Sequence, residues 1–202
     1  MTHALVPYAL KGAIWYQGES NTQYFPDQYR ERFSTLINAW RRAWGQDKFY
    51  FYWCQLAQFK KANEQALNNN GWTTVCDQQR LTLELADTGM AVLNDIGEAN
   101  DIHPKNKIDV GKRLSLWALK QAYGHDLVCS GPLYKSSEIK ADKIIVTFSN
   151  VGSGLMVATK HLMEPARSNT DSLKRFQIRG VDNVWKWADA KIISTDSVEV
   201  FH

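Results

Sequence analysis

The 202-residue sequence predicts an α/β fold in which a parallel sheet is followed by a small antiparallel β region. Short apolar runs alternate three times with amphipathic stretches of helical period, a pattern typical of parallel strands joined by crossover helices. After about residue 129, helical periodicity stops and short strand-like runs alternate with Gly, Asn and Asp turns. The composition, 44% hydrophobic and 22% charged, is that of a globular protein. We therefore expect two domains, at residues 1–128 and 129–202.

Three apolar runs in the first region are continuous rather than alternating in hydrophobicity, as expected of strands buried on both faces of a parallel sheet. They are Lys11–Gln17, Phe49–Ala57 and Met90–Leu93. Each is followed by a stretch with apolar residues at helical spacing. These stretches are Gln28–Trp44, Trp72–Ala86 and Asn106–Tyr123. The first helix is the best defined, because Tyr29, Phe33 and Ile37 share a face, while Pro26 and Gly45 suit its two ends.

The second region contains five short runs bounded by turns such as SNVGSG and RGVDN. The expected strands are Ile144–Phe148, Leu155–Ala158, Arg175–Ile178, Ala190–Ile193 and Val198–Phe201. Because the runs are short and closely spaced, we expect them to pair in a small antiparallel β appendage.

In the first region, the polar segment 60–71 ends in NNNG and is expected to be a loop with at most a helical turn.

Composition and motifs exclude several classes of protein. The 24 Lys and Arg residues against 21 Asp and Glu give a net charge of +3 without a basic block, so neither nucleic acid nor an anionic membrane is an expected partner. No apolar run approaches the ~18 residues that a membrane span needs. Cys54, Cys76 and Cys129 form no CxxC pair and are expected to be buried thiols. Without metal-ligand spacing or nucleotide-binding glycine motifs, we expect neither a metal nor a cofactor.

Two polar clusters follow expected strands, at the edge of a parallel sheet where ligands bind. The first is Gln17–Asn21, with the sequence QGESN. A glycine directly after a buried strand lets the backbone turn sharply and leaves its N–H open to the crevice. Amide side chains beside it can donate hydrogen bonds to a developing oxyanion. The alternative is a simple strand-ending turn, with Glu19 capping a helix or bonding to the backbone.

The second cluster is Asn100–Pro104, in the polar loop after the third expected strand. His103 has carboxylates nearby in the sequence, at Asp95, Glu98 and Asp101. A carboxylate fixes the tautomer of an imidazole and stabilises its protonated form, so these residues have the parts of an oriented general base. The alternative is a solvated loop histidine without a catalytic role.

Taken together, the segments GAIWYQGESN and NDIHPKNKIDVGKRL resemble those of the sialate O-acetylesterase-like carbohydrate esterases of the SGNH-hydrolase superfamily. The later segments SGPLYKS, KIIVTFSNVGSGL and DAKIISTDSVEV are similar to the β region that follows the esterase core in that family. The resemblance implies a flavodoxin-like α/β sandwich and deacetylation of O-acetylated saccharides by a serine nucleophile. It also implies a periplasmic or secreted location, although this sequence carries no export signal.

The resemblance assigns roles to the second cluster. His103 corresponds to the general base that deprotonates the serine and later the attacking water. Asp101 is the candidate acid that orients His103. The superfamily commonly places this acid three residues before the histidine, where this chain has Asn100. A backbone carbonyl or Asp95 therefore stays open as an alternative.

In the first cluster, Gln17, Gly18 and Asn21 match the block that helps to form the oxyanion hole, and Glu19 would be a structural residue. The family's nucleophile lies in an early GQSN-like motif well upstream of this block, and no GDS or GQS occurs in the sequence. We therefore expect the carboxyl-terminal portion of an esterase, with its nucleophile upstream and absent. The alternative makes Ser20, in GESN, the nucleophile.

A sheet that lacks its amino-terminal strands leaves an open apolar edge, so we expect self-association or a companion amino-terminal fragment. We also expect low or no activity from this chain alone. The rival interpretation is a non-catalytic carbohydrate-binding or interaction module that keeps the esterase scaffold.

Overall fold

The computed structural model describes residues 2–46, 48–66, 70–161 and 163–202. The chain forms two compact units. The first unit comprises residues 1–59 and 69–129, and the second comprises residues 60–68 and 130–202. A single turn of helix, α1 (Thr2–Leu5), precedes the first strand.

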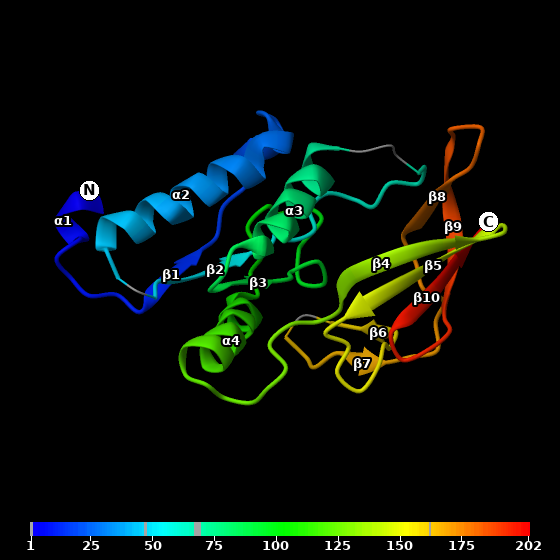
Figure 1. Ribbon diagram of the computed structural model, residues 1–202. Coiled ribbons are helices and arrows are strands. Elements are labelled where there is room, and N and C mark those ends of the chain that lie inside the picture. Colours follow the sequence, from blue (N-terminus) through cyan, green and yellow to red (C-terminus); the bar gives the residue numbers. More distant parts are fainter. Residues whose placement is uncertain (1, 47, 67–69, 162) are drawn as a thin grey trace. The chain divides into compact units, whose positions relative to one another are not determined.

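The first unit contains a three-stranded parallel sheet in the order β1-β2-β3 (Figure 1). Its strands are β1 (Gly12–Trp15), β2 (Tyr50–Cys54) and β3 (Thr88–Ala91). Every residue of β2 and β3 is buried, and the burial of both faces explains why the sequence of β2 is continuously apolar. The three predicted parallel strands are confirmed. β1 and β2 are shorter than their apolar runs, and β3 begins and ends two residues before its run. β1 is an edge strand, and its Ile14 side chain is 70% exposed.

Three α-helices connect and cover this sheet, as the periodicity predicts. They are α2 (Tyr29–Trp44), α3 (Gly71–Leu81) and α4 (Lys107–Trp117). Short 3-10 turns flank them at η1 (Ser20–Thr22), η2 (Pro26–Gln28) and η3 (Thr82–Glu84), and a π-helical turn, η4 (Ala118–Ala122), extends α4. The second and third helices are therefore shorter than predicted, because their last turns change hydrogen-bond spacing while the apolar pattern continues.

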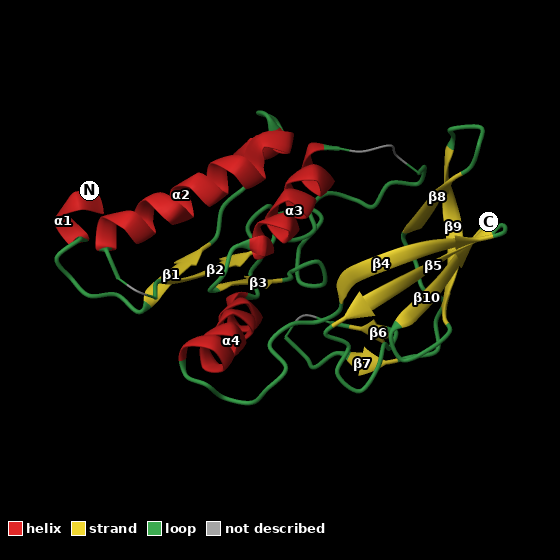
Figure 2. Ribbon diagram, viewed as in Figure 1, coloured by secondary structure: helices red, strands yellow, loops and turns green. Residues whose placement is uncertain are grey.

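The helices lie on both faces of the sheet (Figure 2). α2 and α3 pack on one face, where Ile37 and Val75 join Phe51 and Trp53 of β2 in one cluster. α4 packs on the other face, where Trp117 joins a second cluster. That cluster also contains the alternate residues of β2, which are Tyr50, Tyr52 and Cys54. A strand buried by helices on both faces is the arrangement that the α/β prediction requires.

The second unit is built on a five-stranded antiparallel sheet, which confirms the predicted β region. Its strands, in sheet order, are β4 (Leu133–Lys140), β5 (Lys143–Ser149), β10 (Ser197–Phe201), β9 (Trp185–Ile192) and β8 (Phe176–Arg179). A separate two-stranded ribbon joins β6 (Ala158–Thr159) to β7 (Arg167–Ser168). Alternate side chains of the central strands, among them Val198 and Val200, form its core.

One predicted strand in this region is wrong, and the prediction omits β4. The predicted strand at residues 155–158 is a loop except at Ala158, and Leu155 packs against the core from that loop. β4 is missing from the prediction because nearly all of its side chains are exposed, so its sequence lacks the apolar alternation of a half-buried strand.

The segment 60–66 contains neither helix nor strand, as expected of a loop, while residues 67–69 lie outside the described residues. This loop is part of the second unit although it follows β2 in the sequence. Arg175 donates a hydrogen bond from Nη1 to the carbonyl oxygen of Asn63 at 3.0 Å. Trp187 donates from Nε1 to the carbonyl oxygen of Glu64 at 2.6 Å.

Candidate functional site

The loops that follow the three parallel strands meet at one edge of the sheet. The loops after β2 and β3 form a bridge between Phe59 and Glu98, and Gln58 donates a hydrogen bond to the carbonyl oxygen of Gly97 at 3.3 Å. Gln79 of α3 joins the loop after β1 to the end of β2, because its Nε2 donates to the carbonyl oxygens of Gln17 and Cys54. The predicted polar clusters therefore belong to one edge, as parallel pairing requires.

Within the first cluster, Gly18 is buried and has a φ of +150°. A Cβ atom at this position would lie 3.2 Å from side-chain atoms of Gln79, Leu56 and Val75, so glycine is required by both conformation and space. Among the described residues, the Gly18 N–H has no hydrogen-bond acceptor. Because a buried N–H normally has a partner, this donor is available to a ligand.

The two amide side chains of the cluster are bonded to each other. Gln17 donates from Nε2 to Oδ1 of Asn21 at 2.7 Å. This bond occupies the oxygen of Asn21 and leaves its Nδ2 group without an acceptor in the described part of the chain. Asn21 is thus oriented as a donor, beside Gly18. Gln17 uses one of the two N–H groups of its amide to hold Asn21.

Ser20 begins the short helix η1, and Glu19 precedes it as the N-cap residue. The carbonyl oxygen of Glu19 accepts hydrogen bonds from the backbone N–H and the hydroxyl of Thr22, at 3.2 and 2.7 Å. The Ser20 side chain is exposed, and its hydroxyl makes no hydrogen bond to any residue that the structure describes. The structure therefore pairs Ser20 with no base, and it places Glu19 in the turn.

In the second cluster, His103 lies on the surface with 86% of its side chain exposed. Asp101 accepts a hydrogen bond on Oδ1 from the backbone N–H of His103 at 2.9 Å. The same oxygen lies 3.9 Å from Nδ1 of the His103 ring. The Asp101 carboxylate therefore lies beside the imidazole nitrogen that an orienting acid would contact.

The other acidic residues of this loop are engaged elsewhere. Asp95 forms a bidentate ion pair with Arg113, with both oxygen–nitrogen distances at 2.6 Å. This hydrogen bonding with Asp95 raises the pKa of the Arg113 guanidinium. Glu98 accepts a hydrogen bond from the backbone N–H of Lys105 at 3.0 Å. Of the acids considered from the sequence, Asp101 is the one whose carboxylate lies next to His103. Asp95 is paired with Arg113 instead.

The cysteine side chains are poor nucleophiles in this fold. Burial raises the pKa of the Cys54 thiol to about 12, and burial together with the Asp77 charge does the same for Cys76. Burial also raises the pKa of Cys129. All three thiols are free. Since the thiolate is the reactive form, none of them suits nucleophilic catalysis at neutral pH.

We expect Cys54 and Cys76 to resist a thiol reagent such as 5,5′-dithiobis(2-nitrobenzoic acid) in the native chain at pH 8. A pKa of about 12 leaves about one thiolate in ten thousand at that pH. Reactivity should rise as the pH approaches 12, and all three thiols should react at once in denaturant. The absorbance of released thionitrobenzoate measures this directly. Rapid reaction of more than one thiol in the native chain at pH 8 would contradict it.

Two residues to which the sequence analysis gives no role at the site, Gln79 and Tyr29, donate hydrogen bonds to the first cluster. Gln79 is fully buried, and Tyr29 is nearly so. The hydroxyl of Tyr29 donates to the carbonyl oxygen of Gln17 at 3.0 Å, and Nε2 of Gln79 donates to the same oxygen at 3.1 Å. A signal for Gln79 exists in the sequence, because a glutamine on the apolar face of a helix must find buried partners.

No group of three or more His, Cys, Asp or Glu side chains suited to a metal ion occurs in the described residues. Nor does any helix of the described chain have the length and apolarity needed to cross a membrane.

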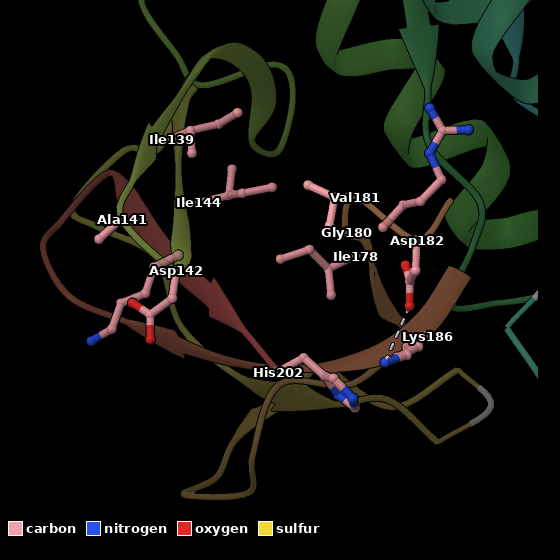
Figure 3. A pocket seen from close by; sticks show the side chains of 12 residues that line it. Ile139, Ala141, Asp142, Ile144, Ile178, Gly180, Val181, Asp182, Lys186 and His202 are labelled. Carbon is pink, nitrogen blue, oxygen red and sulfur yellow. Dashed lines mark ion pairs between the residues drawn. The ribbon is translucent and has the colours of Figure 1, made fainter. Parts of the chain in front are cut away.

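The second unit has a cavity of about 550 Å³, which contains none of the predicted catalytic residues. Its apolar lining includes Ile139, Ile144, Ile178 and Val181, and an ion pair joins Asp182 to Lys186 at 3.6 Å (Figure 3).

Comparison with known proteins identifies the class of this chain. A family described as "Carbohydrate esterase, sialic acid-specific acetylesterase" matches residues 1–120. The sialate O-acetylesterase of Mus musculus is 35% identical over 156 residues, covering 70% of this chain and 29% of the mouse protein. The Homo sapiens sialate O-acetylesterase is 34% identical over 158 residues, covering 71% of this chain and 30% of the human protein.

Among solved structures, a carbohydrate acetylesterase from Xanthomonas citri superposes with a TM-score of 0.83 at 37% identity. The match covers 98% of this chain and 43% of the Xanthomonas protein. The fold and these matches place the chain in a class of carbohydrate esterases built on an α/β scaffold. More particularly, the chain belongs to the sialic acid-specific acetylesterase family of carbohydrate esterases. It spans less than a third of the length of the curated relatives it matches.

Proposed function

We propose that this chain supplies the carboxyl-terminal part of a carbohydrate O-acetylesterase that hydrolyses acetyl esters on sugars with a serine nucleophile. The observation that carries the proposal is the Gly18 N–H, which has no acceptor among the described residues. It belongs to a buried turn that also contains the donor group of Asn21. Two neighbouring donors without acceptors at the carboxyl edge of a parallel sheet suit the oxyanion of acyl transfer. The family to which the chain belongs supports an acetyl ester as the substrate.

In the proposed reaction, the serine comes from a segment outside these 202 residues. Its oxygen attacks the acetyl carbonyl while His103 takes its proton. The carbonyl oxygen becomes an oxyanion that accepts hydrogen bonds from the Gly18 N–H and Asn21 Nδ2. The alcohol of the sugar then leaves with the proton from His103, and an acetyl-enzyme remains. Water attacks the acetyl-enzyme with His103 again as base, and acetate and the free serine are restored.

Asp101 has a positioning role in this scheme. Its carboxylate accepts from the backbone of His103 and lies 3.9 Å from Nδ1 of the ring, so it stabilises the imidazolium that forms during attack. The expected substrate is an O-acetylated saccharide, and we expect the whole protein to be exported, in keeping with the extracellular or periplasmic role that such a substrate suggests.

Hydrolysis of p-nitrophenyl acetate by the 202-residue chain, with Ser20→Ala and His103→Ala beside it, tests the source of the nucleophile. We expect no hydrolysis above the protein-free control in any of the three, because Ser20 has no base within hydrogen-bond distance among the described residues. Tryptophan fluorescence should show that all three are folded. Hydrolysis by the parent chain that is lost in both variants would make Ser20 the nucleophile and overturn this part of the proposal.

A non-catalytic carbohydrate-binding module is the second candidate. The observation in its favour is a pair of exposed aromatic side chains, Tyr24 at 64% and Phe25 at 58%, that follow the Gln17–Asn21 loop. Exposed rings of this kind can stack on sugar faces. Binding of an unacetylated glycan that is unchanged by His103→Ala, together with a lack of ester turnover when the missing segment is supplied, would favour this candidate.

A further inference from the structure

Gln79 lies at the centre of the hydrogen bonds behind the first cluster. Its Oε1 accepts from the backbone N–H of Leu56 at 2.9 Å. Its Nε2 donates to the carbonyl oxygen of Cys54 at 3.3 Å and to that of Gln17 at 3.1 Å. The side chain is fully buried, and both its oxygen and its nitrogen are engaged. Gln79 is thereby fixed relative to both the end of β2 and the turn after β1.

The carbonyl oxygen of Gln17 receives a second donor from another helix. The Tyr29 hydroxyl of α2 donates to it at 3.0 Å. Burial raises the pKa of Tyr29 to about 12, so the phenol keeps its proton throughout the pH range in which esterases are assayed. Two buried donors from α2 and α3 therefore hold one carbonyl group in the turn.

The Gly18 N–H belongs to the same peptide group as the carbonyl of Gln17. The peptide between Gln17 and Gly18 is trans and planar, so its carbonyl and its N–H point in opposite directions. A carbonyl held towards α2 and α3 directs the Gly18 N–H away from them, and that N–H is the one without a partner among the described residues. We propose that Gln79 and Tyr29 are positioning residues that aim the Gly18 N–H at the oxyanion. This inference rests on the proposed function.

Nuclear magnetic resonance of the ¹⁵N-glycine-labelled 202-residue chain tests the geometry without requiring activity. In Gln79→Met, which removes the donor while keeping a similar volume, we expect the Gly18 amide signal to shift and its hydrogen exchange to become faster. Gln58→Met is the matched control, because Gln58 donates to the carbonyl oxygen of Gly97 in the neighbouring loop. That variant should leave the Gly18 signal unchanged. Tyr29→Phe should shift Gly18 in the same direction as Gln79→Met, and it decides the question if Gln79→Met fails to fold.

Kinetics in a longer chain that contains the serine segment test the catalytic consequence. We expect Gln79→Met to lower kcat by about tenfold to hundredfold with little change in KM, since a misdirected donor weakens transition-state binding. A Gly18 signal that stays in place in both folded variants would overturn the inference, as would an equal fall in kcat for Gln58→Met. If the longer parent chain does not hydrolyse ester, the proposed function fails, while the Gly18 signal still decides the geometry.

Discussion

His103→Ala is expected to lower kcat/KM for an acetyl ester by about 10³-fold to 10⁴-fold in a chain long enough to carry the serine nucleophile. Without the imidazole, the serine hydroxyl has no acceptor for its proton, and the leaving alcohol has no donor. Initial rates with p-nitrophenyl acetate and with an O-acetylated sugar, at several substrate concentrations, measure the effect. The loss should appear in kcat rather than in KM, because the ring acts on the reacting atoms more than on the bound sugar.

His125→Ala is the matched control, because His125 is another exposed histidine of the first unit and lies outside both clusters. It should keep the parent rate. Because the His103 side chain is 86% exposed, added imidazole should reach the vacated position and restore part of the activity of His103→Ala, but not raise that of His125→Ala. A His103→Ala enzyme with more than a tenth of the parent activity would contradict the assignment of the general base.

The elements with a strong local signal could be predicted from sequence. β2 is apolar throughout because both of its faces are covered, and α2 has Tyr29, Phe33 and Ile37 on one buried face. β4 could not be predicted, since its side chains face solvent and its place in the sheet is set by backbone pairing with β5. Backbone pairing of this kind leaves little trace in the side-chain pattern.

The sequence indicates which loops carry the candidate site, but it does not show which side chains in them contact one another. Sequence offers Asp95 and Asp101 as rival partners for His103, and only the fold shows Arg113 occupying the Asp95 carboxylate. Likewise, Gln79 is 62 positions from Gln17 in the sequence, and their hydrogen bond depends on the packing of α3 against the sheet. The same holds for residues 60–66, which pack in the second unit although the chain on both sides belongs to the first.

The second large effect concerns the state of association and arises at the edge of the first sheet that β1 forms. β1 pairs with β2 along one side, and no strand of the described chain pairs with its other side. Beside it lies an apolar groove of about 210 Å³, lined by residues that include Ile14, Tyr52, Ala122 and Tyr123. The Tyr52 hydroxyl is buried without a hydrogen-bond partner in the described part of the structure. Unpaired strand edges and buried donors without partners favour pairing with another chain.

We therefore propose that the 202-residue chain on its own pairs with a second copy through β1, and that Ile14→Lys abolishes this pairing. At tens of micromolar, sedimentation velocity should show the parent chain as a dimer or larger species and Ile14→Lys as a monomer. A lysine on an edge strand opposes pairing because two copies would bring like charges together and bury them. Since Ile14 is 70% exposed, the substitution should cost little stability.

Val128→Lys provides the control, because Val128 is similarly exposed, at 60%, in the same unit but is not part of the groove or of β1. It should associate as the parent does. A parent chain that sediments as a single monomer at these concentrations would refute self-association through the edge. Adding a companion segment that carries the missing serine should compete with it, because a sheet edge pairs with one strand at a time. The dimer should then give way to a one-to-one complex, and Ile14→Lys should weaken that complex as well.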